Sequence, residues 1–252
     1  MNKVLVHDLP VRIFHWGLAI SLVSAFAIAK LNSDESSNFT LHAIAGLVAA
    51  LLVAMRIVWG LVGSRYARFG AFRLEPSELV GYLRNALGFG PLDRDVRHNP
   101  ASSWFAIAAM LVVLGLGTTG IMVALGNKSV KDLHELLGWT LVALVASHIA
   151  GIALHSIRAK EWLAVSMISG NRDAEADAAI PSSRPLAGAL FLILPLTFLL
   201  ALLAGFDPAM RQLHLPILGT TLQVGDAPDR DAGGERAKQG EREKREERGD
   251  DD

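Results

Sequence analysis

The chain has 252 residues, of which 51% are hydrophobic and 19% charged, and its formal net charge is −1. A near-neutral chain with no basic groove pattern argues against a nucleic-acid partner. The absence of cysteine excludes disulfides, thiolate-held iron–sulfur clusters and the covalent attachment of a cofactor through Cys-x-x-Cys-His.

The hydrophobic residues fall in five long blocks, at about residues 11–31, 41–62, 103–125, 134–157 and 186–206. A bilayer core about 30 Å thick needs roughly 20 apolar residues in a helix to cross it. Inside lipid each backbone amide must be paired within its own segment, so helices are the expected form. The sequence therefore predicts an all-α integral membrane protein.

The first block also has features of a secretory signal peptide. Lys3 and Arg12 would form its charged start, and the segment Ala25-Phe26-Ala27 resembles a cleavage site. Four further apolar blocks exclude a secreted soluble product, so we expect the first block to remain as a helix.

Positive charge near the ends of the spans predicts the orientation of the chain. Residues 32–39 hold no lysine or arginine, and residues 126–133 hold only Lys128 and Lys131. The other connections and the N-terminus hold Lys3, Arg12, Arg65, Arg68, Arg73, Arg84, Arg94, Arg97, Arg158, Lys160, Arg172 and Arg184. We therefore expect a multi-pass membrane protein with its N-terminus and the arginine-rich connection in the cytoplasm.

The C-terminal part differs in composition from the rest of the chain. Residues 171–206 are predicted to form a linker and an additional fifth helix, and residues 207–252 a polar, disordered tail. From about residue 226 the tail mixes charged residues with glycine and holds almost nothing apolar. As an alternative, the proline-free residues 235–248 fold as a helix against a partner.

Four histidines lie inside the predicted spans, where a polar side chain is costly and therefore points to function. His134 and His148 share the fourth span, fourteen residues apart. In a helix this spacing puts them within roughly 40° of one face and about 21 Å apart. One helix thus offers two imidazoles to the same neighbours at two depths, which is the spacing that two stacked macrocycles need.

The depth of each histidine indicates its partner. On the predicted orientation, His42 and His134 lie near the outer face, whereas His15 and His148 lie nearer the cytoplasm. The pairs His42/His134 and His15/His148 are therefore compatible with two haem irons, each held by two imidazoles. His155, seven residues beyond His148 on nearly the same face, is a rival for the cytoplasmic ligand.

Other residues fit the same hypothesis. Gly46 and Gly138 each follow a candidate ligand by one helical turn, where a missing side chain admits a flat ring or a close helix. Arg56 and Arg12 either anchor the spans at the cytoplasmic face or pair with a haem propionate.

Several segments together resemble the bacterial cytochrome b561 and nickel–iron hydrogenase cytochrome b family. They are Val11-Arg12-Ile13-Phe14-His15-Trp16, the run from His42 through Arg56-Ile57-Val58-Trp59-Gly60, Ser64-Arg65-Tyr66-Ala67-Arg68-Phe69, His98-Asn99-Pro100-Ala101 and the run from His134 to His148. The resemblance covers about residues 1–170. It implies a four-helix transmembrane bundle with two non-covalent b haems, held by His15 with His148 and by His42 with His134.

The resemblance also implies a role in electron transfer. Such proteins conduct electrons between the quinone pool and a redox partner, often an outer-face hydrogenase or a c-type cytochrome. The fifth span and the charged tail depart from the smallest members and favour a protein partner; a homo-oligomer stays open. One alternative is a stand-alone oxidoreductase that passes electrons from superoxide or a small reductant to quinone. A histidine-lined metal or proton transporter is another, although the spans lack the acidic residues that such a path usually contains.

Overall fold

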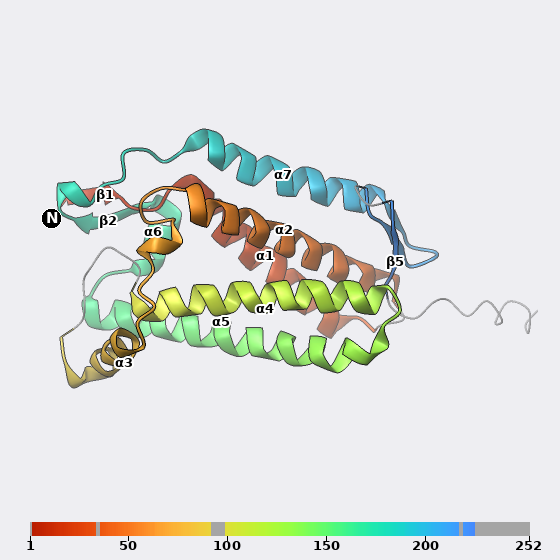
Figure 1. Ribbon diagram of the computed structural model, residues 1–252, viewed down its shortest axis with the longest axis horizontal. Helices are drawn as coiled ribbons and strands as arrows, with labels where there is room; N and C mark the ends of the chain where they lie inside the picture. Colours follow the sequence, from red (N-terminus) through yellow and green to blue (C-terminus); the bar gives the residue numbers. More distant parts are fainter. Residues whose placement is uncertain (1, 34–35, 92–98, 217–218, 225–252) are drawn as a thin grey trace, which may run out of the picture.

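The computed structural model describes residues 2–33, 36–91, 99–216 and 219–224, and its main body is a set of long helices lying side by side (Figure 1). Five helices in this described part are long and apolar enough to cross a membrane. They are α1 (Leu9–Leu31), α2 (Thr40–Val62), α4 (Pro100–Ala124), α5 (Lys131–Ala159) and α7 (Pro185–Ala204). The predicted all-α membrane fold is confirmed.

All five of these helices begin slightly before their apolar blocks, and in α1 and α4 a side-chain cap marks the start. The Asp8 carboxylate accepts the Val11 amide at 3.0 Å, and the Asn99 side chain accepts the Ser102 amide at 2.7 Å. A capping side chain followed by proline in the first turn is a strong start signal, because proline lacks an amide that the first turn leaves unpaired anyway. In α1 and α4 the cap, rather than the first long apolar run, therefore determines where the helix begins.

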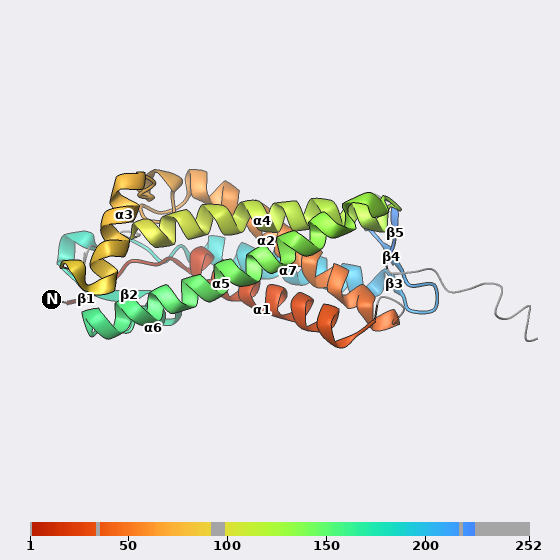
Figure 2. The same cartoon turned by 90° about the horizontal axis from the view of Figure 1, so that it is seen from below.

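The spanning helices pack in a fixed order. Helix α1 packs along α2, α2 along α4, and α4 along α5, while α7 covers α1 and α2. Figure 2 shows α5 running obliquely across α4. A buried cluster at the centre joins α2, α4 and α5 through Ala49, Val53, Met110, Val113 and Leu141. Helix α1 also meets α5, where the Phe26 and Trp139 rings lie with their centroids 5.8 Å apart.

Helix α7 displays the surface that a membrane helix needs. It is apolar on all sides, and leucine side chains such as Leu186, Leu190 and Leu200 are 84%, 56% and 58% exposed. In water such a surface would be unfavourable, whereas in lipid it costs nothing. Gly188 lets α7 approach α1 closely, since a Cβ there would lie 2.7 Å from the Leu9 Cβ.

The N-terminal end of the molecule gathers the arginine-rich connections (Figure 1). It holds the short helices α3 (Pro76–Arg84) and α6 (Leu163–Ser169) and an antiparallel pair of strands, β1 (Asn2–Leu5) and β2 (Asn171–Ala174). The Asp8 carboxylate, 1% exposed, also accepts the indole N–H of Trp59 at 3.0 Å. This contact ties the end of α2 to the start of α1.

The opposite end carries a feature that composition did not predict. The segment expected to begin a disordered tail at residue 207 instead contributes to an antiparallel sheet of β3 (Phe206–Asp207), β4 (Gln212–His214) and β5 (Thr221–Gln223). Leu213 and Leu222, 0% and 2% exposed, pack with Leu202 and Ile44 at the ends of α7 and α2. Burial of these two leucines explains why this polar stretch is ordered, and the expectation of disorder is wrong as far as residue 224. The charged residues from 226 lie outside the described part.

Candidate functional site

Two of the predicted histidines meet between α2 and α5. The ring centroids of His42 and His134 lie 6.0 Å apart, with an angle of 82° between the ring planes. His42 stands in the first turn of α2 and His134 in the first turn of α5, so two helices that start at the same end of the molecule bring them together.

Each ring of this pair is oriented by a hydrogen bond at Nδ1. His42 Nδ1 donates to the Ala25 carbonyl of α1 at 2.9 Å. His134 Nδ1 lies 2.9 Å from Thr119 Oγ1 of α4, and the Thr119 hydroxyl donates its own hydrogen to the Gly115 carbonyl at 2.8 Å. Because a hydroxyl has one hydrogen, Thr119 must accept from His134. Both histidines therefore carry the proton on Nδ1 and keep a lone pair on Nε2.

The pair has the spacing that one shared metal ion requires. Metal–imidazole nitrogen bonds are about 2.0 Å long, so rings on opposite sides of one ion have centroids about 6 Å apart. Throughout the described residues, no group of three or more His, Cys, Asp or Glu side chains could hold a metal ion alone. Two axial imidazoles with the remaining positions unfilled by protein suit an iron carried in a macrocycle.

The other two predicted histidines, His15 of α1 and His148 of α5, lie within electrostatic range of each other. The Phe105 ring of α4 stacks on His148, with 4.0 Å between centroids and 11° between planes, and Trp16 meets His15 edge to face at 5.4 Å. Aromatic packing, in place of the hydrogen bonds seen at the first pair, orients these rings.

His155 takes a different place from the four candidates. It is 3% exposed, and its Nδ1 lies 2.9 Å from the hydroxyl of Tyr82 on α3. The two rings also stack, with 6.0 Å between centroids and 16° between planes. The structure thus brings His155 to α3, while His148 is the histidine near His15.

Arg56 does not extend to water, as an anchoring arginine would. It is 4% exposed and lies among three phenylalanine rings, 6.0 Å from the centroid of Phe14, 5.3 Å from Phe69 and 5.9 Å from Phe72. One guanidinium nitrogen donates to the Ala67 carbonyl at 2.9 Å, and Nη1 is buried without a partner. A buried donor without an acceptor is costly, which suits an anionic group beside it.

The position of Arg56 matches the histidine pattern. It follows His42 by fourteen residues on α2, the same spacing that separates His134 from His148 on α5. At about 1.5 Å per residue, Arg56 lies about 21 Å from His42 along α2 and on nearly the same face. This equals the separation of His134 and His148 along α5. The Arg56 guanidinium carbon lies 6.0 Å from the centroid of Phe14, the residue that precedes His15 on α1. Arg12, the other arginine considered, donates to the Ile168 carbonyl of α6 and keeps its Nε buried without a partner.

Glycines beside the candidate ligands His42 and His134 leave space that a side chain would otherwise occupy. A Cβ built at Gly46 or Gly138 would have no atom within 4 Å. At Gly120 a Cβ would lie 3.3 Å from His134 Cε1, so this glycine lets α4 come close to the ring. The open space at Gly46 and Gly138, one turn beyond His42 and His134, fits a bound haem. The buried Arg56 Nη1 without a partner fits a haem propionate.

Sequence reasoning did not identify two residues that orient the pairs. Thr119 and Phe105 lie on α4, which supplies none of the four histidines, and neither belongs to a local motif. For Thr119 the only signal was its place beside Gly120 in an otherwise apolar span.

Comparison with known proteins identifies the family of the chain. Residues 6–170 match a family model described as prokaryotic cytochrome b561. The chain is similar to the probable Ni/Fe-hydrogenase 1 B-type cytochrome subunit of Escherichia coli K12, with 34% identity over 210 residues, covering 66% of this chain and 89% of the relative. The probable Ni/Fe-hydrogenase B-type cytochrome subunit of Bradyrhizobium diazoefficiens is 26% identical over 213 residues, covering 67% and 85%. No solved structure matches the chain significantly.

Proposed function

This chain belongs to the prokaryotic cytochrome b561 family, and from that premise we propose that it carries electrons across the membrane through two bis-histidine b haems. Its general role is membrane electron transfer, its cofactor is haem b, and it is a multi-pass membrane protein. The finer proposal is that His42 with His134, and His15 with His148, supply the axial ligands.

One observation carries this proposal: α5 presents two histidines at two depths, and each meets a histidine from a different helix. Haem b, when bound, supplies a one-electron couple. Two imidazoles on one iron leave no open position, which suits electron transfer better than oxygen chemistry. Two sites along α5 also divide a crossing of about 30 Å into shorter steps.

The remaining residues hold and tune the sites. The Ala25 carbonyl and Thr119 fix the Nδ1 protons of His42 and His134, which raises the basicity of the ligating Nε2 atoms. Arg56 is the proposed partner for a propionate at the His15/His148 level, because its Nη1 is buried and unpaired.

The proposed electron route ends at two partners. The relatives are named as B-type cytochrome subunits of Ni/Fe hydrogenases. We extend this to a hydrogenase, or a c-type cytochrome, on the outer face as one partner and to the quinone pool as the other. The proposed setting is the bacterial inner membrane, with the arginine-rich N-terminal end in the cytoplasm and residues 1–170 forming the haem-binding unit.

The test is the haem content of the purified full-length protein, measured as its pyridine haemochrome. We expect two b haems per chain, and one haem per chain in His134→Ala and in His148→Ala. His214→Ala is the matched control, because His214 is an exposed histidine of β4 bonded to Thr221. A full haem complement in both ligand variants would refute the ligand assignment, and a protein without haem would refute the function.

A further inference from the structure

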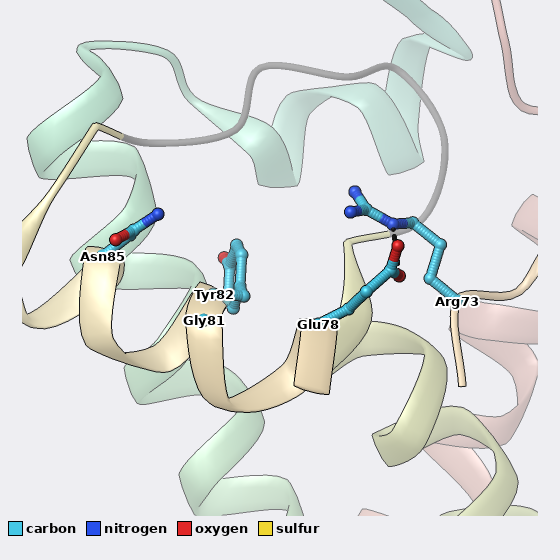
Figure 3. A pocket seen from close by; sticks show the side chains of 5 residues that line it. All are labelled: Arg73, Glu78, Gly81, Tyr82 and Asn85. Atoms are coloured by element: carbon cyan, nitrogen blue, oxygen red, sulfur yellow. Dashed lines mark hydrogen bonds and ion pairs between the residues drawn. The ribbon is translucent and has the colours of Figure 1, made fainter. Parts of the chain in front are cut away.

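A small cavity opens on α3 at the N-terminal end of the molecule. It has a volume of about 230 Å³ and is lined by Arg73, Glu78, Gly81, Tyr82 and Asn85 (Figure 3). In Figure 3 the Arg73–Glu78 ion pair, with 2.9 Å between Nε and Oε2, stands at one side, Asn85 at the other, and Tyr82 between them. The absence of a side chain at Gly81 widens the floor, since a Cβ there would have no atom within 4 Å.

The walls of the cavity offer hydrogen-bond donors of several kinds. Arg73 presents a guanidinium, Tyr82 a hydroxyl and Asn85 a side-chain amide. Such a set suits a ligand whose polar atoms are acceptors, such as the carbonyl oxygens of a quinone ring. The volume is below the roughly 300–1,000 Å³ of pockets for drug-sized ligands, so it suits a single ring rather than a whole tailed molecule.

The outer face of α3 is apolar and exposed. Val80 and Leu83 of α3 are 66% and 46% exposed, and Leu87, in the helical turn Asn85–Phe89 that follows, is 68% exposed, although α3 also bears charged residues. An amphipathic helix at the end of a membrane bundle is expected to lie in the interface, with its apolar side chains in the lipid. An apolar tail leaving the cavity would thus meet lipid directly beside α3.

Tyr82 contacts His155, a buried histidine that is not one of the four proposed haem ligands. The Tyr82 hydroxyl bonds His155 Nδ1 at 2.9 Å, and His155 is 3% exposed. His155 follows His148 by seven residues on α5, which is about 10 Å along the helix axis. The cavity, the Tyr82–His155 pair and the proposed haem ligand His148 therefore lie in this order, with His155 and His148 about 10 Å apart along α5.

We propose that this cavity binds the headgroup of the membrane quinone and that Tyr82, backed by His155, exchanges a proton with it. The inference rests on the function proposed above. Reduction of a quinone to a quinol adds two electrons and two protons, and converts both C=O groups to C–OH. The electrons come singly from the b-type couple at the His15/His148 level. One proton passes from the Tyr82 hydroxyl to a quinone oxygen, Tyr82 recovers it from His155 Nδ1, and His155 takes its replacement from water at this end of the molecule. The second proton reaches the other quinone oxygen from water directly.

The competing interpretation is that Tyr82 and His155 only fasten α3 to α5. A structural contact of this kind affects folding and haem content but leaves the reaction with quinol unchanged in the folded protein. Two conservative variants separate the two roles: Tyr82→Phe keeps the ring and removes the hydroxyl, and His155→Gln keeps a polar side chain of similar reach. Tyr66→Phe is the matched control, because Tyr66 also donates from a buried position at this end, to the Ala178 carbonyl at 2.9 Å.

The experiment follows haem reduction in the purified full-length protein after mixing with a short-chain benzoquinol or naphthoquinol. We expect Tyr82→Phe and His155→Gln to slow the reaction by roughly 10- to 100-fold, as loss of a positioned proton-transfer group does. Their haem content and dithionite-reduced spectra should equal those of the wild type, and Tyr66→Phe should react at the wild-type rate.

The possible failures are distinguishable. If neither quinol reduces the haems of the wild-type protein, the proposed function itself is wrong. If the wild type reacts and both variants react equally fast, the function stands and this quinone site is refuted. Loss of one haem in His155→Gln would make His155 an iron ligand and would also overturn the proposal.

Discussion

Thr119 and the Ala25 carbonyl have the same effect on the two rings of the His42/His134 pair. Each accepts the Nδ1 proton and so selects the tautomer in which Nε2 has the lone pair. The carbonyl belongs to the backbone and cannot be removed by a simple substitution, whereas the Thr119 hydroxyl can. Thr119 is therefore the residue through which this orientation can be tested.

Thr119→Val should weaken haem binding at the His42/His134 level by roughly 10- to 100-fold, because loss of such an outer hydrogen bond typically has this effect on metal sites. The measurement is the rate of haem transfer to an excess of haem-scavenging apoprotein. Thr118→Val is the control, since the exposed Thr118 hydroxyl bonds only the Leu114 carbonyl of its own helix. Thr119→Ser should restore the wild-type rate, and equal rates in both valine variants would argue against the hydrogen bond.

Arg56→Gln should lower the midpoint potential of the haem at the His15/His148 level. Removal of a buried positive charge stabilises the more positive, oxidised iron, and a tenfold change in a one-electron equilibrium corresponds to about 59 mV. Spectroelectrochemical titration of the purified protein measures both haem potentials. Arg68→Gln removes an exposed arginine at the same end and should leave them unchanged. Unaltered potentials in Arg56→Gln would mean that Arg56 only supports its phenylalanine neighbours.

At the scale of secondary structure, the residue spacing along α2 and α5 determines where most of the candidate site residues lie. The fourteen-residue interval recurs on α5 between two histidines and on α2 between His42 and Arg56. Because this interval returns to nearly the same helix face, each helix presents two functional groups to one side at two depths. Gly46 on α2 and Gly138 on α5 lie one turn beyond their histidines and keep that side open.

Gly46→Leu and Gly138→Leu should each reduce the haem content by about one haem per chain, because a leucine side chain would occupy space that a macrocycle needs. The pyridine haemochrome of the purified variants measures this loss. Ala146→Leu places the same side chain at an exposed position of α5, two residues before His148 and on another face, and should keep full haem content. A full complement in both glycine variants would show that the haem lies elsewhere.

At the scale of the whole molecule, the connections at the two ends of the bundle differ in their content of lysine and arginine. The arginine-rich connections and the N-terminus gather at one end, and the β3–β4–β5 sheet lies at the other (Figure 1). The sheet buries leucines against the ends of α2 and α7, so this end is closed by folded chain. An excess of lysine and arginine at one end predicts that this end stays in the cytoplasm.

The absence of cysteine allows this orientation to be measured directly. Arg68→Cys and Lys128→Cys each place a single thiol at an exposed position, the first in the connection that follows α2 and the second in the connection between α4 and α5. In intact spheroplasts, a membrane-impermeant maleimide should label Lys128→Cys, whereas Arg68→Cys should react only after the membrane is opened. The reverse pattern would invert the proposed direction of the chain and place the Tyr82 cavity on the outer face.

The sequence by itself determined the five apolar spans and the positions of four histidines within them. These properties depend on local hydrophobicity and on the periodicity of a helix, which neighbouring residues specify without reference to the fold. The capping residues place the starts of α1 and α4 a few residues before the apolar blocks. The segments Asp8-Leu9-Pro10 and Asn99-Pro100 already indicate these starts in the sequence.

Only the tertiary structure decided how the rings are oriented and what surrounds them. The contacts of His134 with Thr119, of His148 with Phe105 and of His155 with Tyr82 join residues on different helices. The burial of Arg56 and the formation of the β3–β4–β5 sheet likewise follow from packing between distant segments. Such contacts depend on how helices and strands approach one another, and no periodicity within a single segment encodes that approach.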